Sequence, residues 1–166
     1  MKVLFISLAS LALVAVECAL VRALGLSVAR IDVHVAVVLF LALRCQTLEG
    51  AAGAFAVGYF FDVLSGQPSG LYVFSAVLIF LVARLLSPFV DVRSAKGFAP
   101  LAAAVDLLHN LAAVWLATIG AQGISRAAAF GAIWPTAALT ALAALGVWPL
   151  LRSIENLFKK PERGLL

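Results

Sequence analysis

Short polar breaks divide the sequence into six apolar runs, and this pattern predicts a helical membrane protein. The runs cover residues 3–21, 31–43, 50–64, 71–86, 98–119 and 127–151. A transmembrane helix needs about 20 apolar residues to cross a hydrocarbon core about 30 Å thick. Since 64% of the 166 residues are hydrophobic and only 12% are charged, the chain has too few charges to cover a water-exposed surface. We therefore expect one all-α integral membrane domain of six transmembrane helices over residues 1–151, followed by a short basic cytoplasmic tail over residues 152–166.

The second run is the shortest of the six, but the basic residues support counting it as a span. Its 13 residues, 31–43, rise only about 20 Å at about 1.5 Å per residue. With the N-terminus in the cytoplasm, nine of the 12 lysines and arginines fall on the inner side, which is the usual bias. That bias agrees with an even number of spans. The sequence therefore predicts that both termini lie inside.

The charge and the motifs exclude several function classes. The net charge of +4 could suggest nucleic acid, but the basic residues stand at helix ends, where they set topology and meet anionic lipid. The sequence contains no G-x-S-x-G, no H-E-x-x-H, no phosphate-binding lysine loop and no paired-carboxylate motif. We therefore expect no nucleic-acid binding, no catalytic residue, no metal site and no cofactor, and the chain is predicted not to be an enzyme.

The third run carries small residues at four-residue spacing, Gly50, Ala54 and Gly58, followed by Asp62. Positions i and i+4 lie on one face of a helix. Small residues on that face allow another helix backbone to approach closely, which is how helices associate in lipid. This ridge therefore packs either against another helix of the same chain or against a partner, including a second copy of the chain in a homodimer.

Asp62 falls at the C-terminal end of the same run. A carboxylate there opposes the helix dipole, and burying it in lipid is costly. It needs compensation from outer-side water, from backbone N–H groups of the following turn or from a cation such as Arg126. An aspartate before a turn often caps that turn through its side chain. Asp62 is therefore interpreted as a structural cap, with a contribution to a partner surface as the alternative.

The fifth run contains the polar residues Asp106, His109 and Asn110 in its middle. Spacings of three and four place the three side chains on one helix face, and ionisable groups inside a membrane usually have a function. They form a polar clamp between helices, a proton or substrate site, or a contact with a partner's membrane helix. Glu17 and His34 are candidate partners, although His34, near the outer end of a short helix, is expected at the membrane interface.

The stretch from Gly58 to Leu71 resembles the signature of the MreD family of rod shape-determining membrane proteins. In that family a glycine-rich third helix ends in an aspartate, a small polar turn with proline and glycine follows, and a new apolar helix begins. The matching residues here are Gly58, Asp62, Ser65, Gly66, Pro68 and Gly70. Outside this stretch the agreement is mainly one of hydropathy, number of spans and the inside tail.

The resemblance implies a non-enzymatic, multi-pass scaffold in the bacterial inner membrane that supports peptidoglycan synthesis and rod cell shape. Its implied partner is MreC, a bitopic protein with a large periplasmic part. Through MreC the scaffold would connect to the RodA glycosyltransferase, to its penicillin-binding transpeptidase and, indirectly, to MreB. On this hypothesis the third helix and its outer turn dock MreC, and Gly58→Leu would disrupt the complex while leaving insertion intact.

An alternative hypothesis is a transporter subunit. The family resembles, in its overall helical plan, the substrate-binding subunits of energy-coupling-factor vitamin transporters. The polar residues of the fifth run could then bind a vitamin, and the small pair Ala15 and Ala19 could meet a coupling subunit. The chain lacks the long polar outer loops that would close over a substrate.

Overall fold

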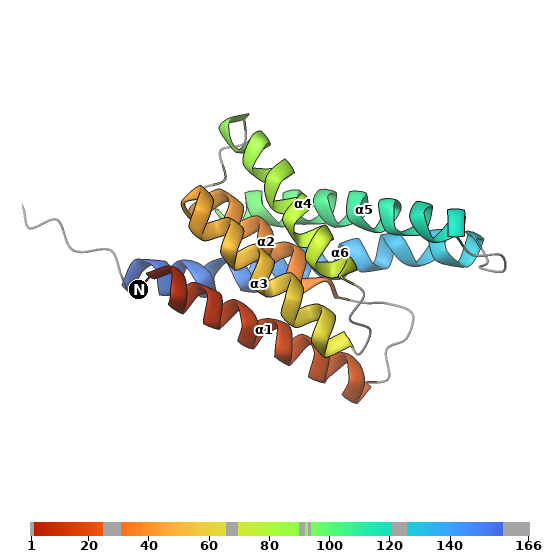
Figure 1. Ribbon diagram of the computed structural model, residues 1–166, viewed down its shortest axis with the longest axis horizontal. Coiled ribbons are helices and arrows are strands. Elements are labelled where there is room, and N and C mark those ends of the chain that lie inside the picture. The colour runs from red at the N-terminus through yellow and green to blue at the C-terminus, as the bar shows by residue number, and fades with distance from the viewer. Residues whose placement is uncertain are drawn as a thin grey trace, which may run out of the picture.

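The computed structural model describes residues 2–24, 31–65, 70–89, 92, 94–120 and 126–157, and this part of the chain consists of helices and short connections, without a strand. The helices are α1 (Lys2–Leu24), α2 (Val33–Arg44), α3 (Thr47–Ser65), α4 (Leu71–Leu86), α5 (Ala95–Gly120) and α6 (Arg126–Leu157), and the short 3-10 helix η1 (Ser87–Phe89) follows α4. The start of α1 and the end of α6 lie at the same end of the bundle (Figure 1). The all-α class is confirmed.

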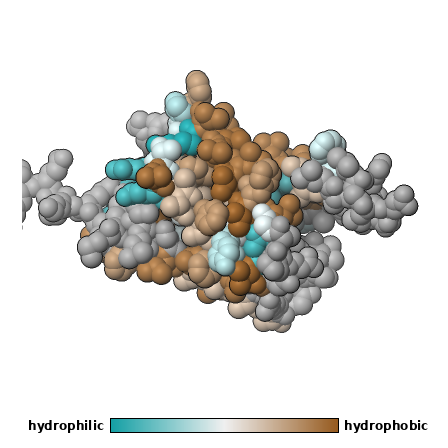
Figure 2. All heavy atoms as spheres, viewed as in Figure 1, coloured by the Kyte–Doolittle hydropathy of each residue, from teal (hydrophilic) through white to brown (hydrophobic). Residues whose placement is uncertain are grey.

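Among the described residues, three stretches are long and apolar enough to cross a membrane: Leu71–Phe89, Ala95–Trp115 and Ile133–Leu157. Two shorter apolar stretches lie in α1 and α2. Large apolar side chains such as Phe74, Leu78 and Leu108 are exposed, as lipid contact requires. Figure 2 shows apolar residues over the visible face of α4, whereas hydrophilic residues gather toward the start of α3. These features are those of a membrane protein.

The short helix α2 is the centre of the bundle. Its residues 33–42 are all buried, and it contacts every other α-helix. Twelve residues rise only about 18 Å at about 1.5 Å per residue. This length is sufficient because protein, and not lipid, surrounds the helix, so the requirement to match the hydrocarbon thickness does not apply to it.

Side chains from other helices satisfy both ends of α2. At its start, Glu17 Oε1 accepts the Val33 N–H at 3.1 Å, and Thr140 Oγ1 accepts the Asp32 N–H at 3.0 Å. At its end, Arg84 Nη1 donates to the carbonyls of Ala42 and Cys45 at 3.0 and 3.2 Å. A carboxylate at the N-terminus and a guanidinium at the C-terminus both match the helix dipole.

The last helix is longer than the sequence predicts. We expected the sixth apolar run to end at residue 151, but α6 continues to Leu157. Glu155 therefore lies on a helix and is buried, and its two carboxylate oxygens accept hydrogen bonds of 3.0–3.2 Å from Arg44. This ion pair joins the end of α2 to the end of α6. The long-range partner explains why a charged segment stays helical instead of forming a tail.

Candidate functional site

The small-residue ridge of α3 packs inside the chain. Gly50, Ala54 and Gly58 are buried, and α3 contacts α4 extensively. A Cβ placed on Gly58 would lie 2.7 Å from Val73 Cα and 2.8 Å from the Tyr72 carbonyl oxygen. The ridge therefore serves the close approach of α3 and α4, which is the first of the two alternatives that the sequence left open.

Asp62 caps the next helix. It is 2% exposed, and its two carboxylate oxygens accept the N–H groups of Tyr72 at 3.4 Å and Val73 at 3.0 Å. The charge is unfavourable for α3 but favourable for the N-terminus of α4. Gly70 precedes that helix with a φ of 74°, a conformation that glycine adopts without strain. The side chain of Ser65 and the family-motif residues Gly66 and Pro68 lie outside the described residues.

Removing this cap is expected to loosen the α3–α4 corner. Asp62→Ala leaves the two N–H groups of α4 without their acceptor, and loss of an N-terminal cap typically costs about 1 kcal/mol. Asp62→Asn keeps one acceptor oxygen and is expected to cost less. Denaturant unfolding of the purified variants in detergent would measure both changes. Equal stability of wild type and Asp62→Ala would show that the cap is energetically irrelevant.

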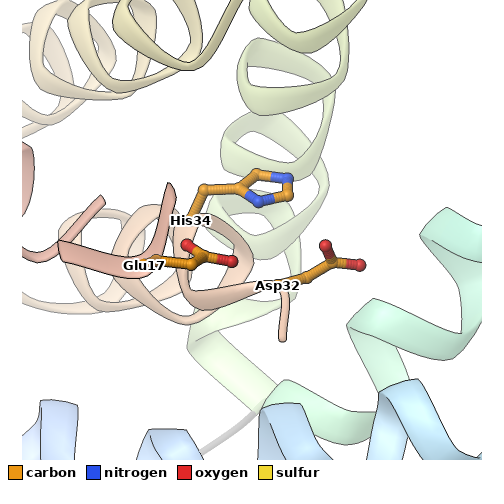
Figure 3. A group of neighbouring side chains, drawn as sticks. All are labelled: Glu17, Asp32 and His34. Atoms are coloured by element: carbon orange, nitrogen blue, oxygen red, sulfur yellow. The ribbon is translucent and has the colours of Figure 1, made fainter. Parts of the chain in front are cut away.

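Six polar side chains gather around the middle of α5, the other region that the sequence indicated as a candidate functional site. The cluster, which we call the polar centre, consists of Glu17, Asp32, His34, Asp106, His109 and Asn110. It joins α1, the start of α2 and α5. Figure 3 shows Glu17, Asp32 and His34 together at the N-terminal end of α2.

Asp32 connects the start of α2 to α5. Asn110 Nδ2 donates to Asp32 Oδ2 at 3.1 Å and to the Asp106 carbonyl oxygen at 3.0 Å. The Asp106 carboxyl is buried near the Asp32 carboxyl, close enough for their charges to interact. Two ionised carboxylates near each other repel, so a proton or a cation beside them would stabilise the pair.

His34 is enclosed by rings. Its ring centroid lies 4.6 Å from that of Phe61, 5.8 Å from Tyr72 and 5.7 Å from His109. His109 in turn has Nδ1 at 2.7 Å from Ser75 Oγ, which links α5 to α4. His34 is fully buried, so its ring faces the interior of the bundle and contacts neither lipid nor water.

Several buried polar atoms of the polar centre have no hydrogen-bond partner in the described part of the chain. Within the described part of the chain, Glu17 Oε2, both ring nitrogens of His34 and both carboxylate oxygens of Asp106 are buried without a hydrogen-bond partner. Arg44 and Arg84 also form hydrogen bonds near α2, but they do so at its C-terminal end, away from the polar centre. Buried polar atoms without partners are rare and costly. The arrangement can therefore accept protons or bind a cation or a polar ligand.

The structure thus brings together the residues that the sequence singled out on the fifth run and also supplies their partners. His34 meets His109, whereas Glu17 meets the N-terminus of α2. Asp32 is the residue that sequence reasoning missed, because it was treated only as the boundary of an apolar run. Its position directly before a helix, where aspartate commonly accepts N–H groups, is a signal that could have drawn attention to it.

A groove between α4 and α5 opens beside the polar centre. The two helices scarcely touch each other, and they enclose a volume of about 370 Å³ over α2. Its walls are mostly apolar, and its polar part is made by Asp32, Ser75, His109 and Asn110. The polar centre is therefore reachable from the groove.

Comparison with protein-family models, curated proteins and solved structures found no significant match. The function is therefore argued from the residues and the geometry of this chain.

Proposed function

We propose that this protein is a non-enzymatic scaffold of the bacterial cell-elongation complex in the inner membrane, with six transmembrane helices and both ends in the cytoplasm. We further propose that the groove between α4 and α5 binds the transmembrane helix of a bitopic, MreC-like partner. The groove is the observation that carries the proposal, and the MreD-like stretch around Asp62 supplies the identity of the partner.

The groove has most of the length that a membrane-spanning helix needs. Leu71 and Leu86, the first and last residues of α4, both line it. The 16 residues of α4 rise about 24 Å at about 1.5 Å per residue, which approaches the hydrocarbon thickness of about 30 Å. A helix laid along α4 would therefore be covered for most of its path through the membrane.

The surface of the groove also suits a helix. Leu78, Val82 and Leu108 offer apolar side chains along its walls, and Ala112 and Ala113 leave room on the α5 side. Small residues allow close helix approach, and polar side chains can bond across helices in lipid. The hydroxyl, imidazole and amide groups at the polar part of the groove favour an occupant that carries a polar residue at the same depth.

This location replaces the one suggested by the sequence. The face of α3 that carries Gly50 and Gly58 is used by α4, so a partner cannot reach it without separating the two helices. Co-purification with Gly58→Leu would consequently test the folding of the chain and not its partner surface. Binding through the groove requires a different variant.

The test is co-purification of a tagged chain from native membranes with mass spectrometry, using a variant that fills the groove. Ala112 lines the groove and is exposed, whereas Ala104 is exposed on the same helix and does not line it. Ala112→Trp is expected to reduce recovery of the MreC-like partner by about tenfold or more, as the loss of a well-packed interface contact does. Ala104→Trp, the matched control, should recover it as wild type does.

Two results would contradict the proposal. Equal recovery of the partner by Ala112→Trp and wild type would exclude the groove as the docking site. Recovery of a coupling subunit with its ATPases, and of no elongation protein, would instead support the transporter hypothesis.

The polar centre is the observation that favours this second candidate, the substrate-binding subunit of an energy-coupling-factor vitamin transporter. Three of its residues border the groove, which is large enough for a small molecule. Calorimetric titration of the purified chain with vitamins would test it. Tight binding that is lost in Asp106→Asn would support the transporter, and the absence of binding would leave the scaffold as the better account.

A further inference from the structure

Glu17, Asp32 and His34 form a compact set of metal-ligating groups. Each residue offers one ligand atom, and the three atoms lie within 4.8 Å of one another. The three side chains come from two places in the chain, the end of the apolar stretch in α1 and the start of α2, and one ring nitrogen of His34 faces the two carboxyl groups (Figure 3). We propose that these residues bind a divalent transition-metal ion of the Zn²⁺ and Mn²⁺ class.

The ligand set has the chemistry of such a site. One imidazole and two carboxylates are donors that Zn²⁺ and Mn²⁺ accept, and three protein ligands leave positions open for water or a further side chain. Metal–ligand bonds of about 2.0–2.2 Å place the ligand atoms of a tetrahedral site about 3.4–3.6 Å apart. The three ligand atoms, which lie within 4.8 Å of one another, therefore have to move closer by up to about 1 Å when an ion binds.

The second observation is that the buried ring nitrogens of His34 lack hydrogen-bond partners. His34 is 0% exposed, and neither of its ring nitrogens has a hydrogen-bond partner in the described part of the chain. A buried imidazole without any partner loses the hydrogen bonds that it made in water. Coordination of one nitrogen to a cation would compensate for that loss.

Capping of α2 accounts for only one of the two carboxylate oxygens of Glu17. Its Oε1 accepts the Val33 N–H, but its Oε2 is buried without a partner. Glu17, Asp32 and Asp106 are three buried carboxyl groups in one place. Uncompensated charges of this kind are costly inside a membrane, and a divalent cation neutralises two of them at once. The inference concerns a site that the proposed scaffold function does not require, so each can fail without the other.

The experiment uses the full-length chain in detergent after removal of any affinity tag and of bound metal with a chelator. Calorimetric titrations with Zn²⁺ and with Mn²⁺ measure stoichiometry and affinity for wild type, Glu17→Gln and His34→Gln. Glu17→Gln keeps an oxygen for the Val33 N–H and removes the charge. Glu49→Gln makes the same chemical change at an exposed position of α3 and is the matched control.

We expect one equivalent of at least one of the two ions to bind to wild type and to Glu49→Gln. Affinity should fall by at least about tenfold in Glu17→Gln and His34→Gln, because even residues that only support a ligand typically cost about 10–100-fold. Wild-type protein that binds neither ion stoichiometrically, or variants that bind as wild type does, would overturn the proposal.

A second measurement covers the case in which the variants fail to fold. Co²⁺ bound to wild type should give visible absorption bands of a low-coordinate nitrogen- and oxygen-ligated ion, and Zn²⁺ should displace them. Absence of these bands at one equivalent of Co²⁺ would overturn the site without any variant.

Discussion

Replacing Gly58 with alanine is expected to destabilise the protein by about 1–3 kcal/mol, the usual cost of overpacking a close contact. The added methyl would lie 2.7 Å from Val73 Cα and 2.8 Å from the Tyr72 carbonyl oxygen. Both are backbone atoms, so α4 as a whole has to move away from α3. That movement also weakens the bonds from Asp62 to the first N–H groups of α4. Gly58→Leu should be worse, and unfolding by denaturant in detergent would measure both variants.

Gly146→Ala in α6 is the matched control for this prediction. A Cβ at Gly146 would have no atom within 4 Å, and alanine favours a helix over glycine by about 1 kcal/mol. The control should therefore be neutral or stabilising. If Gly58→Ala were as stable as Gly146→Ala, then the close approach of α3 and α4 would not hold in the membrane.

The second large effect is expected at the opposite end of α2. Arg44→Met removes the three hydrogen bonds that Arg44 donates to the carboxylate of Glu155, which is 4% exposed. Breaking a buried ion pair in this way costs about 3–5 kcal/mol. The Arg44 side chain is 26% exposed, so we expect the lower end of that range. A fall in thermal stability, followed by fluorescence in detergent, would show the loss.

The double variant Arg44→Met with Glu155→Met distinguishes the effect of losing the ion pair from the effect of losing the packing of the arginine. It removes both ions, and an apolar replacement of a buried pair is often neutral or stabilising. We therefore expect it to recover much of the stability lost in Arg44→Met. A double variant as unstable as the single one would mean that the lost packing of the arginine, and not the lost ion pair with Glu155, accounts for the loss of stability.

The positions of the helices could be predicted well because each depends on local sequence. The run at 71–86 matches α4 residue for residue, since a glycine stands before it and Ser87 and Pro88 follow it. The end of α6 was misplaced, because charged residues suggested a tail. Glu155 stays on the helix because Arg44, 111 positions away, neutralises it. A local pattern contains no information about such a partner.

The candidate site was predicted in part. The spacing of Asp106, His109 and Asn110 correctly placed three polar groups on one helix face, but it could not show that Asp32 and His34 would meet them. Likewise, the small residues of α3 correctly indicated close helix packing, whereas the choice between a partner and the same chain depended on where α4 lies.

The sequence by itself determined the all-helical membrane character of this protein, because apolar composition and periodicity act within each segment. It also determined which faces carry small or polar residues. Only the tertiary structure decided what those faces meet: α4 covers the glycines of α3, and α2 becomes a buried central helix with Glu17 and Arg84 at its ends. The reason is that burying a short helix or a charge is favourable only when groups distant in the chain converge on it, and that convergence is a property of the assembled bundle.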